Sequence, residues 1–299
     1  GLQGQDSFTY QLSDGSASAR ATVTVDLQLP DVIEGLAADD VLSGSQADDV
    51  ILALAGRDTV FGGDGADTIS GGAGNDWLHG GAGDDVFAVA GWSGGYDRLV
   101  GGTGRDRLLG SELNDHLGLG RFTPADSVEV IDGGGGYDRV VGSDAKTVWD
   151  FSATELIGIA LLDAGGGRDT VTGSAGDDTV MGGSGSDRLF GAAGDDVFIV
   201  VGADQGCDVI YGGEGRDTIL GGSGDDHIGL QILGRQQSIE VIDGGAGSNR
   251  IAGGDDDTTW DFSGTELVNI AAIDSRGGDD TVLGSAGDDV IIGGAGNDL

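Results

Sequence analysis

The chain repeats a nine-residue unit, and this period constrains its fold more than any other feature. Residues 32–85 divide without remainder into six units, VIEGLAADD, VLSGSQADD, VILALAGRD, TVFGGDGAD, TISGGAGND and WLHGGAGDD. Further units occupy 98–115, 170–196, 209–226 and 281–298. A fixed period of this kind predicts a solenoid, in which each unit packs only on its neighbours.

Each unit joins a short apolar strand to a glycine-rich turn. The strand consists of Val, Ile, Leu or Thr with the large side chain directed inward, a composition that favours β structure. The next six residues, such as GGAGND, hold too much glycine for a helix but suit a tight turn with positive φ angles. Two units make one coil, so we expect an all-β fold, a parallel β-roll or β-helix solenoid of roughly fifteen coils stacked at about 4.8 Å.

A longer repeat is superimposed on the short one. Residues 82–187 match residues 193–298 at a constant offset, with SVEVIDGGGG returning as SIEVIDGGAG and WDFSATEL as WDFSGTEL. One module is therefore duplicated. We divide the roll, residues 30–299, into regular repeats at 32–115, 169–226 and 280–299 and two wider coils at 116–168 and 227–279, where the nine-residue phase is lost.

Acidic residues give the chain a net charge of -38, from 52 Asp and Glu against 14 Lys and Arg. Self-repulsion on this scale opposes a compact state unless cations bind between the carboxylates. The cationic residues include one lysine, Lys146, and are scattered, so they cannot form the basic surface that a nucleic acid requires. The sequence has no apolar run long enough for a membrane span, and the lone Cys207 is expected to be a free thiol.

The sixth residue of most turns is aspartate. Because two units make one coil, Asp40 should stack over Asp58, and Asp58 over Asp76, which would bring like charges together. A hard divalent cation between stacked turns removes this repulsion, with oxygen supplied by the carboxylates and by glycine carbonyl groups. Several oxygen ligands in a flexible site suit Ca²⁺ better than Mg²⁺, and there is no Cys/His cluster for zinc.

These turns resemble the calcium-binding nonapeptide GGxGxDxUx of the repeats-in-toxin (RTX) family, also known as the hemolysin-type repeat. The resemblance covers most of residues 32–299 and implies roughly ten Ca²⁺ ions held between successive turns. It also implies type I secretion from a Gram-negative bacterium. The implied ligands are the side chains of Asp40, Asp49, Asp58, Asp67, Asp76, Asp85, Asp97, Asp106, Asp115, Asp169, Asp178, Asp187, Asp196, Asp208, Asp217, Asp226, Asp280, Asp289 and Asp298, with Gly62, Gly71, Gly80, Gly101, Gly182, Gly212 and Gly221 in the turns.

Several positions depart from the family pattern. Thr147, Asn249 and Thr258 replace the sixth aspartate, and the first two turns, GLAADD and GSQADD, lack the full set of glycines. These turns are the weakest candidates for calcium binding. The wider coils at 116–168 and 227–279 are likewise expected to bind little or no calcium, because regular aspartate spacing is largely absent from them.

Residues 1–29 follow a different pattern. The segment DSFTYQLSDGSASARATVTVDL alternates apolar and polar residues in two runs around a Ser-Asp-Gly turn, which predicts an antiparallel β-hairpin. It resembles the closing strands of a cadherin-like or immunoglobulin-like bacterial sandwich repeat, and Pro30 would mark the boundary with the roll. The alternative is an N-terminal cap on the roll.

Other chemistry is poorly supported. Gly91-Trp92-Ser93-Gly94-Gly95 fits the G-x-S-x-G pattern, but that pattern signals a nucleophile only between a strand and a helix. We therefore expect no enzyme activity. The three histidines, His79, His116 and His227, are interpreted as surface residues, and Trp149 and Trp260 as core or edge packing.

The composition and repeats favour a calcium-binding structural module of a large extracellular or cell-surface bacterial protein, such as an adhesin or exoprotein. Its partner would be calcium, with surface or matrix ligands contacted through other domains and no nucleic acid or membrane span. The alternative is the accessory repeat domain of a secreted protease, lipase or alginate epimerase whose catalytic domain lies outside this chain, and a surface-layer protein is a third class. Because the ligands must be ionised, protons should compete with calcium below about pH 5.

Overall fold

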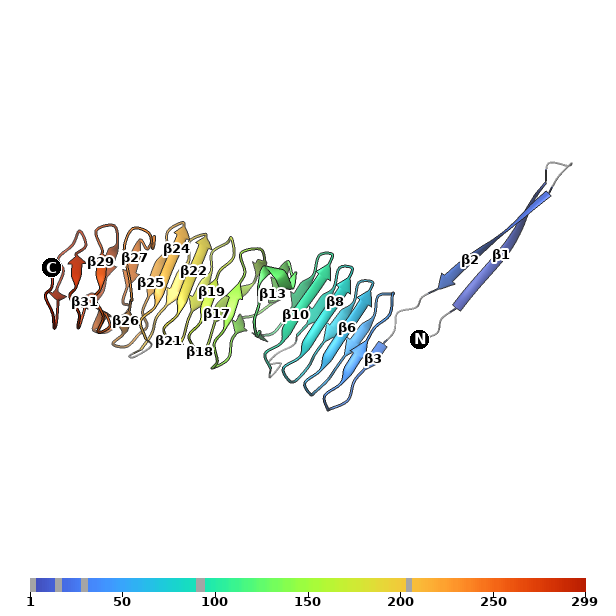
Figure 1. Cartoon of the computed structure of the whole chain (residues 1–299), viewed down its shortest axis with the longest axis horizontal. Helices are drawn as coiled ribbons and strands as arrows, with labels where there is room; N and C mark the ends of the chain where they lie inside the picture. Colours follow the sequence, from blue (N-terminus) through green and yellow to red (C-terminus); the bar gives the residue numbers. More distant parts are fainter. Residues whose placement is uncertain (1–3, 14–17, 28–31, 90–94, 203–205) are drawn as a thin grey trace.

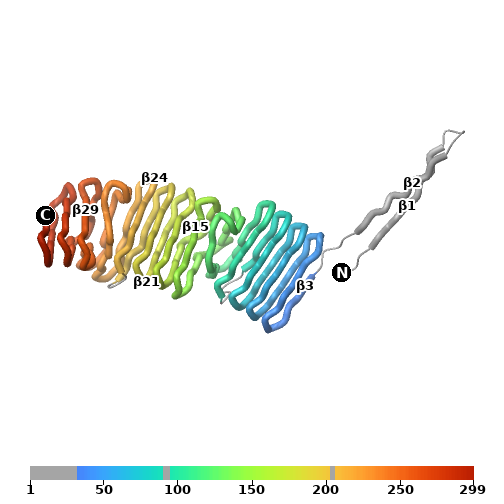
Figure 2. The backbone as a smooth tube through the Cα atoms, viewed as in Figure 1, coloured from blue at the N-terminus to red at the C-terminus, as the bar shows by residue number. Residues whose placement is uncertain are grey.

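Short parallel strands stacked into coils form the architecture of the chain in the computed structural model (Figure 1). The structure describes residues 32–89, 95–202 and 206–299 in full, and only the strand backbone of β1 (Gly4–Ser13) and β2 (Ser18–Leu27) before them. Figure 2 traces the coils along one long axis from residue 32 to the C-terminus. The prediction of an all-β parallel β-roll is confirmed.

The first part of the roll has two faces. Strands from alternate half-coils pair in parallel with partners one coil away, as in Ile51 opposite Ile69 and Val60 opposite Leu78. One face is a sheet of seven strands: β3 (Val32–Glu34), β5 (Val50–Leu52), β7 (Thr68–Ser70), β9 (Val86–Ala88), β11 (Arg107–Leu109), β13 (Val130–Asp132) and β16 (Glu155–Ile157). The other face has four: β4 (Val41–Ser43), β6 (Thr59–Asp64), β8 (Trp77–Ala82) and β10 (Arg98–Thr103).

The wide coil at 116–168 has three sides instead of two. A short 3-10 helix, η1 (Pro124–Asp126), contacts β10, and Phe122 bridges to Trp149, which adds a third row beside the two faces. Two new sheets begin in this coil. One begins with β12 (His116–Gly118), β14 (Asp138–Val141) and β17 (Ile159–Asp163), and the other begins with β15 (Val148–Asp150). The seven-stranded sheet ends at β16, while these two new sheets become the faces of the next regular roll.

The second module repeats this arrangement. The eight-stranded sheet continues from β17 through β20 (Thr179–Met181), β23 (Val197–Ile199), β25 (Thr218–Leu220), β27 (Val241–Asp243) and β30 (Glu266–Val268), and the opposite sheet from β15 through β19 (Thr170–Thr172), β22 (Arg188–Ala193) and β24 (Val209–Glu214). The second wide coil then starts β26 (His227–Gly229), β28 (Asn249–Ala252), β31 (Ile270–Asp274) and β33 (Ile291–Ile292), with β29 (Thr259–Asp261) paired to β32 (Thr281–Leu283). The two-residue strands β18 (Gly166–Gly167) and β21 (Ser184–Gly185) pair in a turn.

The roll has about 12 turns, fewer than the roughly fifteen expected from the sequence. Stacked aspartates are 18 residues apart in the regular repeats, as in Asp49 and Asp67, but 21 apart where a twelve-residue unit intervenes, as in Asp76 and Asp97. The spacing rises to 23 in the wide coil, between Asp115 and Asp138. Longer coils mean fewer coils for the same chain length.

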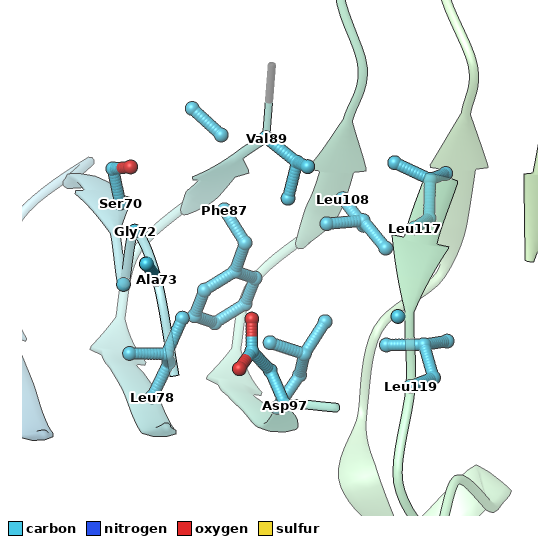
Figure 3. Close-up of a pocket in the computed structure, with 14 residues that line it drawn as sticks. Ser70, Gly72, Ala73, Leu78, Phe87, Val89, Asp97, Leu108, Leu117 and Leu119 are labelled. Atoms are coloured by element: carbon cyan, nitrogen blue, oxygen red, sulfur yellow. The ribbon is translucent and has the colours of Figure 1, made fainter. Parts of the chain in front are cut away.

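The core is a continuous column of inward-facing side chains. Ile51, Val60, Ile69 and Phe87 are fully buried, and the same column extends through both wide coils to Ile273. A cavity of about 230 Å³ lies within this column, between apolar side chains such as Leu78, Phe87 and Leu117 (Figure 3). Most of the three-residue strands therefore have their central apolar side chain inside, as the repeat predicts.

The prediction for residues 1–29 is left untested. The hairpin and its sandwich-like parent domain stay a prediction, and Pro30 lies outside the described residues. In the part of the chain that the structure describes, no helix has the length and apolarity that a membrane crossing requires.

Candidate metal centre

The position-six aspartates form ladders along the edges of the roll. In each ladder the backbone N–H of one aspartate donates a hydrogen bond to Oδ1 of the aspartate one coil later, as from Asp58 to Asp76 and from Asp67 to Asp85, both at 2.8 Å. The nonapeptide places each aspartate immediately before a strand, so the carboxylates stack when the strands pair. The ladders run Asp40–Asp58–Asp76–Asp97, Asp49–Asp67–Asp85–Asp106–Glu129, Asp115–Asp138, Thr147–Asp169–Asp187–Asp208, Asp178–Asp196–Asp217–Glu240, Asp226–Asn249 and Thr258–Asp280–Asp298.

The second carboxylate oxygen of many ladder residues has no hydrogen-bond donor. Oδ2 is buried and unpartnered in eleven aspartates. A buried acceptor without a donor costs about 1–3 kcal/mol, and more when it is charged. Eleven such atoms in repeating positions indicate a missing cationic partner rather than eleven separate defects. These aspartates are Asp58, Asp67, Asp76, Asp85, Asp106, Asp138, Asp169, Asp187, Asp196, Asp217 and Asp280.

Backbone carbonyl groups lie beside these oxygens. A Cβ built on Gly62 would overlap both Asp67 Oδ2 and the carbonyl oxygen of Gly80, one coil later. A Cβ on Gly191 would likewise meet Asp196 Oδ2 and the carbonyl oxygen of Gly212. In these two turns a side chain at the first position would meet converging carboxylate and carbonyl oxygens, whereas the turns of Asp58, Asp169 and Asp280 begin with Ala53, Ala164 and Ser275.

This donor set fits calcium. It consists of carboxylate and carbonyl oxygens, which are hard ligands in a flexible loop, and Ca²⁺ accepts six to eight of them. Among the described residues, no three His, Cys, Asp or Glu side chains converge on one point. A cation bound here would therefore take much of its coordination from turn carbonyl groups, with carboxylates from successive coils.

Burial raises the pKa of several ladder carboxyls, such as those of Asp85 and Asp196, in the absence of a cation. Desolvation is the main cause, opposed by the backbone hydrogen bond to Oδ1 and reinforced by neighbouring aspartates. The pKa reaches about 6 for Asp85 and Asp169 and about 7 for Asp97, Asp196 and Asp208. The ladder is therefore an environment that favours binding either a proton or a metal ion.

Six of the sequence-predicted aspartates lie in a different environment. Their Oδ2 or Oδ1 accepts hydrogen bonds from the second residue of their own turn, as in Asp178, whose Oδ2 accepts from Ser174 N at 2.6 Å and Ser174 Oγ at 3.0 Å. The six are Asp40, Asp49, Asp115, Asp178, Asp226 and Asp289. Asp97 and Asp208 accept the ladder bond at Oδ1, in turns that also include residues outside the described ranges.

The sequence interpretation missed three acidic residues of the ladders. Asp138, inside the first wide coil, is buried with an unpartnered Oδ2, and Glu129 and Glu240 end two ladders as acceptors for Asp106 N and Asp217 N. The turn GGGGYD at 133–138 was a sufficient signal for Asp138. No local motif marks the glutamates, because they reach the ladder from irregular segments.

The three residues that replace aspartate at the sixth turn position make different hydrogen bonds in their ladders. Asn249 keeps the ladder, since its Oδ1 accepts a hydrogen bond from Asp226 N at 3.0 Å. Thr147 and Thr258 have no carboxylate; each donates its backbone N–H to the next aspartate and its Oγ1 hydroxyl to a backbone carbonyl oxygen. An amide or a hydroxyl can therefore hold the backbone together here without supplying the charge that a cation needs.

The remaining sequence candidates lie away from the ladders. Trp149 and Trp260 are buried in the core, as predicted, and Trp149 Nε1 donates to the carbonyl oxygen of Gly120 at 2.7 Å. His79 is half-buried and stacks on Phe61. Gly91-Trp92-Ser93-Gly94 lies outside the described residues, and Cys207 is a free thiol.

Comparison with known families agrees with this geometry. The family described as RTX calcium-binding nonapeptide repeat (4 copies) matches residues 30–60, 61–89, 93–117, 163–198, 203–228, 238–259 and 274–299. These ranges cover more than half of the chain, which therefore belongs to the RTX calcium-binding repeat family. The family's repeats imply Ca²⁺ binding and are typical of secreted bacterial proteins. A search of curated proteins found no match.

Proposed function

We propose that this chain is a calcium-switched structural module of a large secreted or surface-attached bacterial protein, an adhesin or exoprotein, which folds on meeting extracellular calcium. The observation that carries the proposal is the set of eleven buried, unpartnered Oδ2 atoms in the aspartate ladders. The net charge of -38 supports it, because repulsion opposes folding until cations neutralise the turns.

The energetics are sufficient for a switch. With affinities of about 0.1–1 mM per site, typical of extracellular modules, millimolar calcium stabilises each site by about 1–2 kcal/mol. Roughly ten sites would contribute on the order of 10–20 kcal/mol, similar to the stability of a whole domain. At a cytosolic calcium concentration of about 10⁻⁷ M this contribution vanishes. The chain would then stay unfolded before export, which suits type I secretion.

The test is a calcium titration of the full chain after treatment with chelator, followed by far-ultraviolet circular dichroism. We expect a steep coil-to-β transition at roughly millimolar calcium that magnesium does not reproduce. A β spectrum already complete in excess chelator would refute the proposal.

We also propose that the module is catalytically inert. Its carboxylates serve the repeat turns, and the G-x-S-x-G segment belongs to a turn of the repeat in sequence. Esterase, protease and glycosidase assays of the calcium-loaded chain should match buffer. Turnover that disappears on Ser93→Ala would contradict this.

The second candidate is an accessory repeat domain of a secreted protease, lipase or alginate epimerase. The same ladders would serve it equally, so the sequence of the parent protein decides between the two. Tandem sandwich repeats before this segment, in line with the hairpin predicted at 1–29, favour the adhesin. An H-E-x-x-H motif or a lipase domain favours the enzyme.

A further inference from the structure

The turns of the roll adopt two conformations that divide the aspartates into two groups. In the eleven turns whose Oδ2 is unpartnered, which we call open turns, the second and fourth residues both have positive φ. In the six turns that bond their own aspartate, which we call closed turns, neither residue is among the positive-φ positions of the described chain. The two groups do not overlap.

The φ angle at the second position decides where its N–H points. With positive φ at Gly183, the turn makes no bond from this N–H to Asp187 Oδ2, and that oxygen is left without a donor. In the closed turn of Asp178, the N–H and Oγ of Ser174 both donate to Oδ2. The closed carboxylate is thus satisfied by protein groups alone.

The open form is imposed even where it is unfavourable. The second residue of three open turns is not glycine, yet Leu54, Ala192 and Arg276 have φ of 78°, 84° and 68°. Holding such residues in the left-handed region costs about 1 kcal/mol or more each. Composition alone therefore does not select the conformation, and Gly222 sits at the second position of a closed turn.

The position of a turn in its ladder accounts for whether the turn is open or closed. Every ladder begins with a closed turn or with threonine: the first members are Asp40, Asp49, Asp115, Asp178 and Asp226, with Thr147 and Thr258. Every open turn is a second or later member. The first turn of a ladder has no earlier turn of that ladder beneath it, and its aspartate accepts hydrogen bonds from its own turn instead.

Serine is the recurrent side chain of this position. Four closed turns read Gly-Ser at the start, and in each the serine N–H and Oγ donate to the sixth aspartate while Oγ accepts the N–H of the fourth residue. These serines are Ser45, Ser111, Ser174 and Ser285. The arrangement parallels a helix N-cap, in which a hydroxyl and a backbone N–H complete an interrupted hydrogen-bond pattern.

We propose that the closed turns are metal-free caps, which carry the family's aspartate but start five of the seven ladders with hydrogen bonds in place of Ca²⁺. Calcium is then confined to steps between open turns, such as Asp67 to Asp85 or Asp196 to Asp217. This inference rests on the proposed calcium binding. It removes Asp40, Asp49, Asp115, Asp178, Asp226 and Asp289 from the ligands that the family pattern implies.

The test compares two substitutions in one ladder. Asp196→Asn and Asp178→Asn change neighbouring members, and Asn249 shows that asparagine can keep the ladder bond. Bound calcium per chain is measured by elemental analysis after gel filtration in millimolar calcium. We expect Asp196→Asn to lose at least one ion and Asp178→Asn to lose none. Equal losses in the two variants would overturn the inference, whereas a wild-type chain without bound calcium would overturn the proposed function as well.

Two further measurements do not depend on how well these variants fold. Anomalous scattering from calcium-loaded wild-type crystals should place ions beside Asp187 and Asp196 and none beside Asp178 or Asp226. Ser174→Ala should keep the wild-type ion count and lower the melting temperature by roughly 2–4 °C, because it removes both hydrogen bonds that Ser174 Oγ makes in the cap. An ion on Asp178, or an unchanged melting temperature for Ser174→Ala, would contradict the cap.

Discussion

Gly62, the first residue of its turn, has no side chain, and this leaves room for two oxygen atoms beside its Cα. At Gly62, an added methyl group would overlap Asp67 Oδ2 and the Gly80 carbonyl oxygen. We expect Gly62→Ala to lower the free energy of unfolding in calcium by about 1–3 kcal/mol and to weaken calcium binding, because the backbone of the next coil cannot move away freely. Chemical denaturation at fixed calcium measures both effects.

Gly224→Ala is the matched control for this substitution. Gly224 also lies in a repeat turn, but nothing is within 4 Å of its added Cβ and its φ is not positive. Its free energy of unfolding should stay within about 0.5 kcal/mol of the wild type. Equal destabilisation by both alanines would show that the convergence of oxygens on Gly62 has no special cost.

The raised pKa values of the ladder carboxyls give two opposite pH dependences. Without calcium, an aspartate with a folded pKa of about 7 and an unfolded value of 3.8 stabilises the fold when protonated, so this stability is present at low pH and lost as the pH rises through about 7. With calcium, protons compete for the same oxygens, so the calcium affinity falls as the pH drops through the range of about 7 to 6. This limit lies above the pH of about 5 suggested by ordinary carboxyl groups.

Calcium titrations at a series of pH values between about 8 and 5 measure this competition. The midpoint should move to higher calcium as the pH falls, and the folded fraction in chelator should rise over the same range. A midpoint that is the same at about pH 8 and pH 6 would contradict the assignment of the ladder carboxylates as ligands.

At the scale of the strand, the wide coils depend on their aromatic side chains. Trp149 on β15 is 0% exposed, donates to the Gly120 carbonyl oxygen and packs near Phe151. Trp149→Ala should lower the free energy of unfolding by about 3–5 kcal/mol, because it opens a large cavity where three sides of the coil meet. Thermal or denaturant unfolding in saturating calcium is the measurement.

Trp77→Ala provides the comparison for Trp149→Ala. Trp77 lies on β8 but is 42% exposed, where it contacts His79 and Arg98 on the outer surface. Trp77→Ala should lower the free energy of unfolding by well under half as much as Trp149→Ala, because less of the apolar area of Trp77 is buried in the folded protein. A larger effect at Trp77 than at Trp149 would mean that the aromatic interior of the wide coil is not what stabilises it.

The elements also show where prediction from sequence succeeded and where it failed. The nine-residue phase predicts strand, turn and stacking correctly because each depends on residues within one unit, as for Ile51 or Val60. It does not predict the third side of the wide coil, since the bridge from Phe122 to Trp149 joins residues with no shared period. It also does not separate Asp178 from Asp187, whose different environments depend on whether a turn of the same ladder precedes them.

For the whole molecule, stacking only between neighbours predicts that damage stays local. A double variant, Asp67→Asn with Asp85→Asn, removes charged ligands from one ladder of the first module. Hydrogen exchange in millimolar calcium should show lost protection in β6 to β10, with protection kept in β20 to β25. Uniform loss over the chain would indicate that the two modules fold as one cooperative unit.

The duplication has a consequence for how such a protein can change in length. β33 pairs with β31 through Ile291 and Ile273, the same register that β20 makes with β17 through Val180 and Leu162. In the first copy, β23 continues the stack from β20. A gene that gained another copy of the module at this point would encode a surface that the existing roll already matches. Unequal recombination could then add or delete whole segments of the roll without a new interface, and the length of the roll becomes a trait that selection can adjust in fixed steps.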